Sequence, residues 1–263
     1  MSDTVLYSEA DGIGTITFNR PQVFNAMSGE LMIAFRDLTA RLKTSATLRA
    51  LIIKGNGKAF LAGGDVAMFN ANKDDPQFVH TVSELIDVLH ASISNLRALP
   101  FPVIAEVHGA CAGAGMSLMA ACDFAIAATG TQFKTAYSMI GLTPDGGGTF
   151  FLPRMVGMRK ATELIMLSES LSAEAALEMG LINRVVALEV LHAEVEALAT
   201  RLAAGPTGTY AGTKALLNQA MSNTLSLQLE AEKASFVACT KTADFNEGVG
   251  AFVAKRAAKF SGK

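Results

Sequence analysis

Charged residues are scarce in this sequence. Only 17% of its 263 residues are charged, with 22 basic and 24 acidic side chains and a net charge of −2, while 50% are hydrophobic. A chain this apolar can bury a large core, which excludes intrinsic disorder. The near-neutral balance lacks the basic surface that attracts nucleic acids or anionic membranes, so we expect neither as a partner. So little charge on so long a chain also predicts surface that is buried between subunits.

Long hydrophobic runs are missing too. The central stretch without an acidic or basic residue, 107–122, has 16 residues and contains three glycines. A membrane-spanning helix needs about 20 apolar residues, so this stretch is too short to cross a bilayer. The first residues, MSDTVLYSEADG, have neither the basic nor the apolar segment of a secretory signal. We therefore expect a cytoplasmic protein.

Cysteines and the common catalytic motifs are also sparse. Cys111, Cys122 and Cys239 are odd in number and lack CxxC spacing, which predicts reduced cysteines in the core. The sequence contains no GxxxxGKS or GxxxxGKT phosphate-binding loop, no HExxH and no GxSxG. Its four histidines are scattered along the chain. Neither a metal site nor a nucleophilic triad is predicted.

What the sequence does contain is an alternation of strand-like and helical segments. A helix over 78–99 is predicted to end before Pro100, and an earlier helix has apolar residues at 31, 35, 38 and 42 on one face. Strands that alternate with helices pair in parallel through crossover connections. The four short runs of strand-forming residues lie at 14–18, 50–54, 103–107 and 124–128.

The second half of the sequence has a different, mostly helical pattern. Ser172 is the predicted N-cap of one of these helices and Gly180 its stop. We therefore divide the chain into an α/β core at 1–200 and a helical C-terminal region at 201–263. The other stretches with helical periodicity are 189–203, 207–221, 225–239 and 245–260.

Three glycine-rich segments stand at strand ends or helix entries, where ligands bind in open α/β folds. They are AFLAGGD at 59–65, GACAGAG at 109–115 and GLTPDGGG at 141–148. Glycine lets a ligand approach the backbone closely, so that backbone N–H groups become the functional atoms. Two such loops that donate to one oxygen would form an oxyanion hole.

These segments resemble the crotonase (enoyl-CoA hydratase/isomerase) family, and the resemblance extends over nearly the whole chain. It also covers NRPQVFNA at 19–26, LSAEAALEMGL at 171–181 and EGVGAFVAKR at 247–256. TPDGGGTFFLPRMVG is most similar to ring-epoxide (epoxyphenylacetyl-CoA) isomerases and related enoyl-CoA isomerases. The resemblance implies an α/β fold with a ββα spiral core, an acyl-CoA thioester as substrate, and a homotrimer or dimer of trimers held by the helical C-terminal region.

The resemblance assigns the binding roles of the family to individual positions of this sequence. The resemblance implies an oxyanion hole made by the backbone N–H groups of Gly64 and Ala114. Alanine replaces the usual glycine at 114 but keeps the N–H, which would gain from the dipole of the helix that begins there. No separate cofactor or metal is implied, because coenzyme A is part of the substrate. The positions expected to contact coenzyme A are Ala26, Ala62, Asp65 and, more weakly, Lys255 on the C-terminal helix.

The acid–base residues depart from the hydratase pattern. Hydratases of this family carry two glutamates, and Ser117 and Tyr137 occupy those positions here. Asp145 stands where isomerases and one dehalogenase branch carry their acidic residue. One carboxylate can take a proton from C2 and return one to C4, which moves a double bond. The resemblance therefore implies an isomerase of enoyl-CoA or of ring-epoxide phenylacetyl-CoA. We expect Ser117 to be a spacer whose small size leaves room for a bulky acyl group.

Several of these residues also have simpler interpretations. Asp145 fits a turn or an N-cap, and Asp65 fits the N-cap of the helix that follows it. Tyr137 fits either a hydrogen-bond donor into the acyl pocket or a packing residue. Glu106 and His108 share one face of a strand, either as an acid–base pair or, more simply, as structural contacts.

Three other functions stay open at this point. The first is an enoyl-CoA hydratase with an altered acid–base set. The second uses Asp145 as a nucleophile, as in the aryl-CoA dehalogenase branch. The third is a non-catalytic relative that binds acyl-CoA or RNA, although the balanced charge disfavours RNA.

Overall fold

A six-stranded sheet forms the centre of the core in the computed structural model, which describes residues 3–263. The first two strands are antiparallel, and every other neighbouring pair is parallel, as strands joined through helices require. The four runs predicted as strands are all confirmed. In sheet order, the strands are β1 (Val5–Ala10), β2 (Ile13–Phe18), β3 (Ala50–Gly55), β4 (Val103–Val107), β6 (Phe124–Ala128) and β9 (Arg184–Val186).

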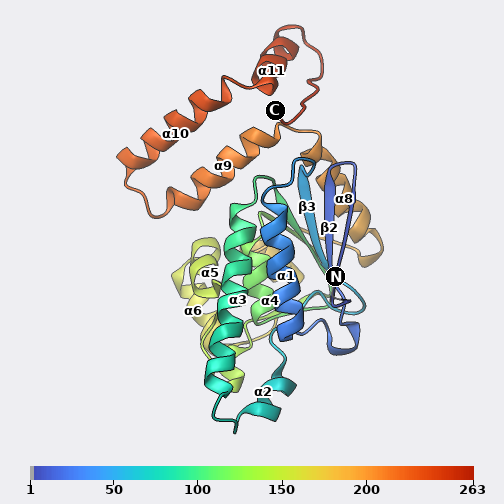
Figure 1. Cartoon of the computed structure of the whole chain (residues 1–263), viewed down its shortest axis with the longest axis vertical. Helices are drawn as coiled ribbons and strands as arrows, with labels where there is room; N and C mark the ends of the chain where they lie inside the picture. The colour runs from blue at the N-terminus through green and yellow to red at the C-terminus, as the bar shows by residue number, and fades with distance from the viewer. Residues whose placement is uncertain (1–2) are drawn as a thin grey trace.

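Helices cover both faces of this sheet (Figure 1). Leu51 and Ile53 of β3 pack into one apolar cluster, whereas Ile52 between them packs into the other. Successive side chains of a strand point to opposite faces of the sheet, so this alternation shows that β3 is buried on both faces. The first cluster lies under α1 (Gly29–Leu42), α3 (Phe78–Ala98) and α4 (Ala114–Ala121), and the second lies under α8 (Leu188–Ala203).

The helix α3 has nearly the predicted bounds, and α1 lies where the apolar face at 31, 35, 38 and 42 predicted a helix. The N-cap of α1 is Ser28, whose hydroxyl accepts from the Leu31 N–H, and the predicted face of α1 is buried. Only the second half of α3 is buried in the core, through residues such as Leu89, Ile93 and Leu96. The first half leaves its apolar side chains free to line a cavity.

No helix within residues 3–263 is long and apolar enough to cross a membrane.

A second, smaller sheet and a group of short helices complete the core. Ser172 caps α7 as predicted, because its hydroxyl accepts from the Ala175 N–H. Gly180 follows that helix with a φ of +76°. The strands of the smaller sheet are β5 (Ala110–Ala112), β7 (Gln132–Lys134) and β8 (Leu171–Ser172). The short helices are η1 (Pro21–Val23), α2 (Val66–Asn72), η2 (Tyr137–Ile140), α5 (Gly148–Val156), α6 (Met158–Leu167) and α7 (Ala173–Glu178).

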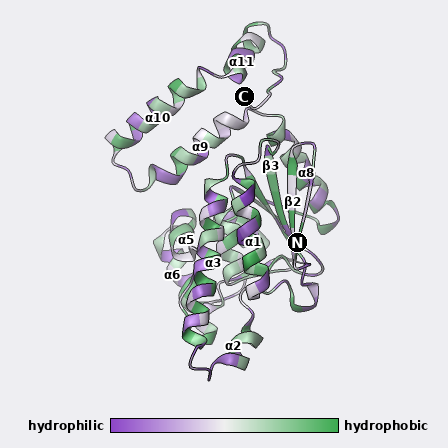
Figure 2. Cartoon of the chain, viewed as in Figure 1, coloured by the Kyte–Doolittle hydropathy of each residue, from purple (hydrophilic) through white to green (hydrophobic). Residues whose placement is uncertain are grey.

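The last three helices extend away from the core (Figure 1). They are α9 (Thr207–Ala220), α10 (Leu225–Cys239) and α11 (Ala243–Val253). No residue of α10 is buried, although Figure 2 shows hydrophobic turns along it. The division of the chain into regions 1–200 and 201–263 stays a prediction.

The three cysteines are unpaired, but they differ in burial. Burial raises the pKa of the Cys122 thiol to about 12 and that of the Cys111 thiol well above its usual value. Neither is therefore a reactive thiolate at neutral pH. Cys239 lies on α10 and is partly exposed, so its expected place in the core is wrong.

The helix α11 ends earlier than its apolar periodicity predicted. Lys255, two residues beyond Val253, adopts a left-handed φ of +51°. The Glu247 carboxylate then accepts hydrogen bonds from the Arg256 guanidinium at 2.6 Å and from the Lys259 N–H at 2.7 Å. These bonds turn the final residues back along α11, so Lys255 is not helical as we expected.

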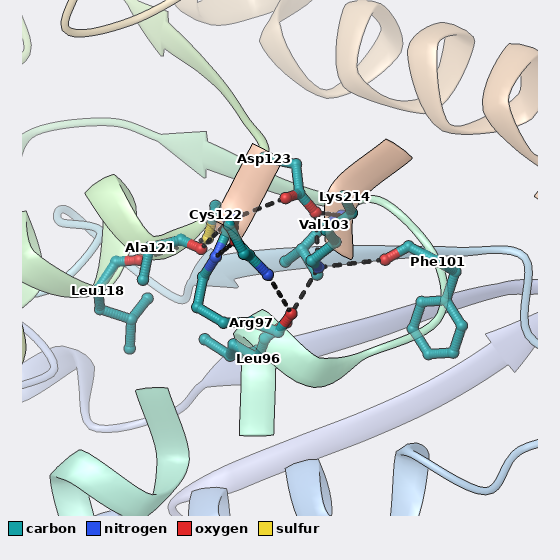
Figure 3. Close-up of polar contacts among 10 residues, drawn as sticks. Leu96, Arg97, Phe101, Val103, Leu118, Ala121, Cys122, Asp123 and Lys214 are labelled. Carbon is teal, nitrogen blue, oxygen red and sulfur yellow. Dashed lines mark hydrogen bonds and ion pairs between the residues drawn. The ribbon is translucent and has the colours of Figure 1, made fainter. Parts of the chain in front are cut away.

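A partly buried ionic cluster joins α9 to the core (Figure 3). Lys214 of α9 lies 2.8 Å from Asp123 Oδ2, and Arg97 of α3 lies 2.9 Å from Asp123 Oδ1. The Lys214 ammonium also donates to the Leu96 carbonyl at 3.0 Å. Burial lowers the pKa of Lys214, and the Asp123 carboxylate opposes that effect. The cluster thus ties the C-terminal ends of α3 and α4 to α9.

Candidate active site

The first two glycine-rich segments run side by side at the carboxyl ends of β3 and β4. Leu61 and Cys111 form a parallel bridge. The Leu61 N–H donates to the Ala110 carbonyl at 3.2 Å, and the Ala112 N–H donates to the Leu61 carbonyl at 2.9 Å. A Cβ on Gly115 would collide with the Leu61 carbonyl oxygen, so glycine is required there. This pairing fixes the two loops relative to each other.

Two backbone donors, Gly64 and Ala114, lie on the wall of one cavity beside this pairing. Gly64 shortly precedes α2, and Ala114 is the first residue of α4. Within residues 3–263, neither N–H donates to a protein acceptor. The Ala114 N–H also lies at the positive end of the α4 dipole. Both groups are free to donate to a ligand oxygen, and their role as an oxyanion hole stays a prediction.

The cavity has a volume of about 760 Å³ and a mainly apolar lining. Its walls come from the two paired loops, α2, the first half of α3, η2 and the third glycine-rich segment. Its size lies within the range of small-molecule sites. The apolar lining residues are Met27, Met32, Val66, Phe69, Val82, Leu85, Ile86, Leu89, Met139, Ile140, Leu142 and Pro144.

Asp145 lies on the wall of the same cavity and is held by two hydroxyl groups. The phenol of Tyr137 donates to Asp145 Oδ1 at 2.6 Å, and Ser117 Oγ donates to the main-chain oxygen of Asp145 at 2.8 Å. Burial, together with the negative charge and hydrogen bond of Asp145, raises the pKa of Tyr137. The phenol therefore keeps its proton at neutral pH and stays a donor. Tyr137 lines the cavity as well.

The carboxylate of Asp145 does not cap the following helix. The N-cap of α5 is Gly147, without any side-chain hydrogen bond. The Asp145 carbonyl closes a turn by accepting from the Gly148 N–H at 3.0 Å. The N-cap interpretation of this residue is therefore wrong, and the turn involves its main chain alone. The φ angles of Gly146 and Gly147, +57° and +83°, explain why glycine follows the aspartate.

Ser117 has a different role from the one we expected. It is buried and does not line the cavity, so it is not a spacer for the acyl group. A Cβ on Gly148 would lie 2.8 Å from Ser117 Oγ, and a Cβ on Gly146 would lie 3.1 Å from Ser117 Cβ. Its small size therefore makes room for the loop that carries Asp145. A glutamate at 117 would collide with that loop.

His90 is a cavity residue that the sequence analysis missed. It lies on α3 and lines the cavity, and the Gly146 N–H donates to its Nε2 at 3.3 Å. This contact links α3 to the third glycine-rich segment. The sequence does place His90 on the same helix face as two apolar residues, because Val82, Ile86 and His90 recur at intervals of four in a predicted helix. Nothing in the sequence indicates that this helix face borders a cavity.

The residues expected to contact coenzyme A are only partly brought together. Ala62 lines the cavity. Asp65 caps α2 by accepting from the Met68 N–H at 3.2 Å, and it pairs with Arg20 at 3.1 Å. Arg20 also donates to the Ala26 carbonyl. The N-cap interpretation of Asp65 is thus confirmed, while contacts of Ala26, Ala62 and Asp65 with coenzyme A stay predictions.

Lys255 is not part of this arrangement within one chain. It follows the end of α11, and Figure 1 shows α11 at the opposite end of the molecule from α2, which lines the cavity. Contact of Lys255 with coenzyme A therefore stays a prediction, and it would have to involve the cavity of another subunit or a part of the ligand outside this cavity.

Glu106 and His108 do not form an acid–base pair. Glu106 accepts from Nδ1 of His192 on α8 at 3.0 Å, on the sheet face opposite α3 and α4. His108 Nε2 donates to the Gly57 carbonyl at 3.0 Å. Neither residue lines the cavity, so the simpler interpretation as structural contacts is confirmed.

Within the described residues, no group of three or more histidine, cysteine or acidic side chains could hold a metal ion.

Comparisons with known proteins agree with this architecture. The family model for enoyl-CoA hydratase/isomerase matches residues 8–263. The chain is 37% identical to the 1,2-epoxyphenylacetyl-CoA isomerase of Escherichia coli (strain K12), over 100% of both chains. It is 35% identical to the trans-2-decenoyl-(acyl-carrier-protein) isomerase of Streptococcus mutans, over 98% of each chain.

A solved structure extends the similarity to the fold. The crystal structure of an enoyl-CoA hydratase from Polaromonas sp. JS666 matches with a TM-score of 0.92 and 35% identity, over 97% of this chain and 99% of that one. The crotonase-type α/β fold expected from the sequence is therefore confirmed. The similar proteins include both isomerases and a hydratase.

Proposed function

The chain belongs to the enoyl-CoA hydratase/isomerase family, and we propose that within this family it is an acyl-CoA isomerase. The observation that carries the proposal is the acid–base set on the cavity wall. Asp145 faces the cavity with a phenol as its side-chain partner, and the two positions that resemble the hydratase glutamates hold Ser117 and Tyr137. A site with one carboxylate suits proton transfer between two carbons of one substrate better than the addition of water.

The proposed reaction uses the backbone donors and the carboxylate together. The thioester oxygen accepts hydrogen bonds from the N–H groups of Gly64 and Ala114. Asp145 takes a proton from C2, and the electrons of that C–H bond form a dienolate whose negative charge lies on the thioester oxygen. The protonated Asp145 then gives the proton to C4, which leaves a double bond between C2 and C3. Donors that are already in place stabilise the dienolate without reorganisation.

The proposed substrate is an acyl-CoA thioester with an apolar acyl group. The lining of the cavity, rich in methionine, leucine and isoleucine, supports an apolar group, either linear or cyclic. We propose that the reaction needs no further cofactor, because the thioester itself provides the acidic C–H bond.

The proposal includes assembly into a homotrimer or a dimer of trimers. The exposed apolar side chains of α10 and α11 support it, since Leu225 and Phe252 are 76% and 85% exposed in the single chain. Such side chains are usually covered by another subunit.

The test is a comparison of products from a small panel of thioesters. The purified protein is incubated with linear β,γ-enoyl-CoAs, with 1,2-epoxyphenylacetyl-CoA and with an α,β-enoyl-CoA, and the products are identified by mass spectrometry and NMR. Isomerisation gives a product of unchanged mass from one of the first two classes. Hydration of the α,β-enoyl-CoA without any isomerisation would contradict the proposal and favour a hydratase.

A further inference from the structure

We infer that Tyr137 is a positioning residue that binds Asp145 Oδ1 and so leaves Oδ2 as the atom that exchanges protons with the substrate. Ser117 supports it by fixing the main chain of Asp145. This inference rests on the proposed function and assigns roles to the two residues that stand in place of the hydratase glutamates.

The two carboxylate oxygens of Asp145 differ in their hydrogen bonds. Oδ1 of Asp145 accepts the 2.6 Å hydrogen bond from Tyr137. Oδ2 accepts no hydrogen bond from any residue within 3–263. A hydrogen bond to a charged group is short and strong, and it fixes the rotation of the carboxylate. The free oxygen is therefore held in one place beside the cavity.

The hydroxyl groups of Ser117 and Tyr137 both donate their protons to Asp145. Ser117 Oγ lies 3.3 Å from the Tyr137 phenol oxygen, but the hydroxyl proton of Ser117 goes to the Asp145 carbonyl. The phenol proton goes to the Asp145 carboxylate. Both the main chain and the side chain of Asp145 are thus held, although the glycines that follow it would otherwise permit many conformations.

Contacts of the residues on either side of Tyr137 hold it in place. It begins η2, and the preceding residue, Ala136, has a left-handed φ of +61°. Hydroxyl groups on either side hold this turn against α6. Thr135 Oγ1 donates to the Leu164 carbonyl at 2.6 Å, and the hydroxyl oxygens of Ser138 and Ser168 lie 2.8 Å apart. A group held in this way can position a catalytic carboxylate without moving.

The test uses Tyr137→Phe and Ser117→Ala, with Tyr7→Phe as the matched control. Tyr7 donates to Glu9 at 2.7 Å on β1, so the control removes the same kind of hydrogen bond away from the cavity. For Tyr137→Phe we expect kcat to fall roughly tenfold or more, the scale of one lost hydrogen bond to a charged group. The dissociation constant of acetoacetyl-CoA should stay within a factor of two, because the backbone donors are unchanged. Ser117→Ala should show a smaller fall in kcat, and Tyr7→Phe none.

A spectroscopic measurement tests the contact independently of turnover. The sequence has only three tyrosines, so protein labelled with ¹³C at the tyrosine Cζ gives three signals, and Tyr137→Phe identifies one of them. We expect Asp145→Asn to move the Tyr137 signal and to leave the other two in place. An unmoved Tyr137 signal, or a kcat for Tyr137→Phe equal to that of an active wild type, would overturn this inference alone. A wild type that isomerises none of the panel would overturn the proposed function and this inference with it.

Discussion

Tyr137 and Asp145 are eight residues apart in the chain, and the phenol of the first donates a 2.6 Å hydrogen bond to the carboxylate of the second. This pair gives the cavity a neutral donor and one carboxylate on the same wall. A water molecule that adds across a double bond needs proton transfer at both oxygen and carbon, which two carboxylates can share. The observed pair instead suits a proton that leaves one carbon and returns to another.

The backbone donors predict binding of an enolate-like ligand without metal. Protein treated with EDTA should bind acetoacetyl-CoA, whose enolate resembles the proposed intermediate, and calorimetric titration measures the affinity. Asp145→Asn should keep the dissociation constant within a few-fold, because the substitution leaves the Gly64 and Ala114 N–H groups in place. Binding that appears only after metal is added would contradict this prediction.

Ser117 packs against Gly146 and Gly148 of the third glycine-rich segment. We therefore predict that replacing Ser117 with the glutamate of hydratases does not produce hydratase activity. Ser117→Glu places a long charged side chain where Gly146 and Gly148 already pack. We expect a loss of at least ~2 kcal/mol in stability, from overpacking and from burial of a charge. Thermal unfolding and hydration of crotonyl-CoA are measured beside Ser117→Ala, which tests loss of the hydroxyl alone. A stable Ser117→Glu protein that hydrates crotonyl-CoA would show that the loop is not an obstacle.

The ionic cluster around Lys214 predicts that losing the Asp123 carboxylate destabilises the protein more than losing the Lys214 ammonium (Figure 3). Asp123→Asn leaves Lys214, which is 7% exposed, without its carboxylate, and should cost about 3–5 kcal/mol. Lys214→Met should cost less, because Asp123 keeps its bonds to Arg97 and to the Val103 N–H. Denaturant unfolding of both variants at equal protein concentration measures the order. A larger loss for Lys214→Met would contradict this account of the cluster.

The exposed apolar side chains of α10 and α11 predict a closed oligomer. Light scattering should give about three or six times the chain mass of 27.6 kDa. Replacing Leu225 and Phe236, which are 76% and 72% exposed, by serine should shift the mass toward that of one chain while the secondary structure is retained. A monomer at every concentration of the unmodified protein would overturn the prediction.

Much of the fold could be predicted because strand and helix periods are local. The strands β4 and β6 and the helix α10 have the bounds that their residue patterns indicate. The helix α11 was extended too far because its end depends on contacts with Glu247, which no periodicity records. Cys239 is expected in the core because its surroundings in the sequence are apolar, but α10 has no buried residue and Cys239 is partly exposed.

The candidate site was harder to predict because it depends on contacts between distant segments. The glycine loops indicated backbone donors, and the resemblance pointed to Asp145. The sequence did not indicate that Ser117 packs under Gly146 and Gly148, since these residues meet only through folding. His90 was missed for the same reason, because its helix face borders the cavity only in the folded chain.

The most direct test of the central claim is exchange of the C2 protons of a saturated acyl-CoA in heavy water, followed by NMR. A saturated chain can be deprotonated at C2 but cannot isomerise, so the measurement isolates the base. Wild type should exchange these protons, Asp145→Asn should exchange them at least ~100-fold more slowly, and Glu106→Gln should match wild type because Glu106 lies on the other face of the sheet. Exchange by Asp145→Asn at the wild-type rate would contradict the assignment of Asp145 as the base.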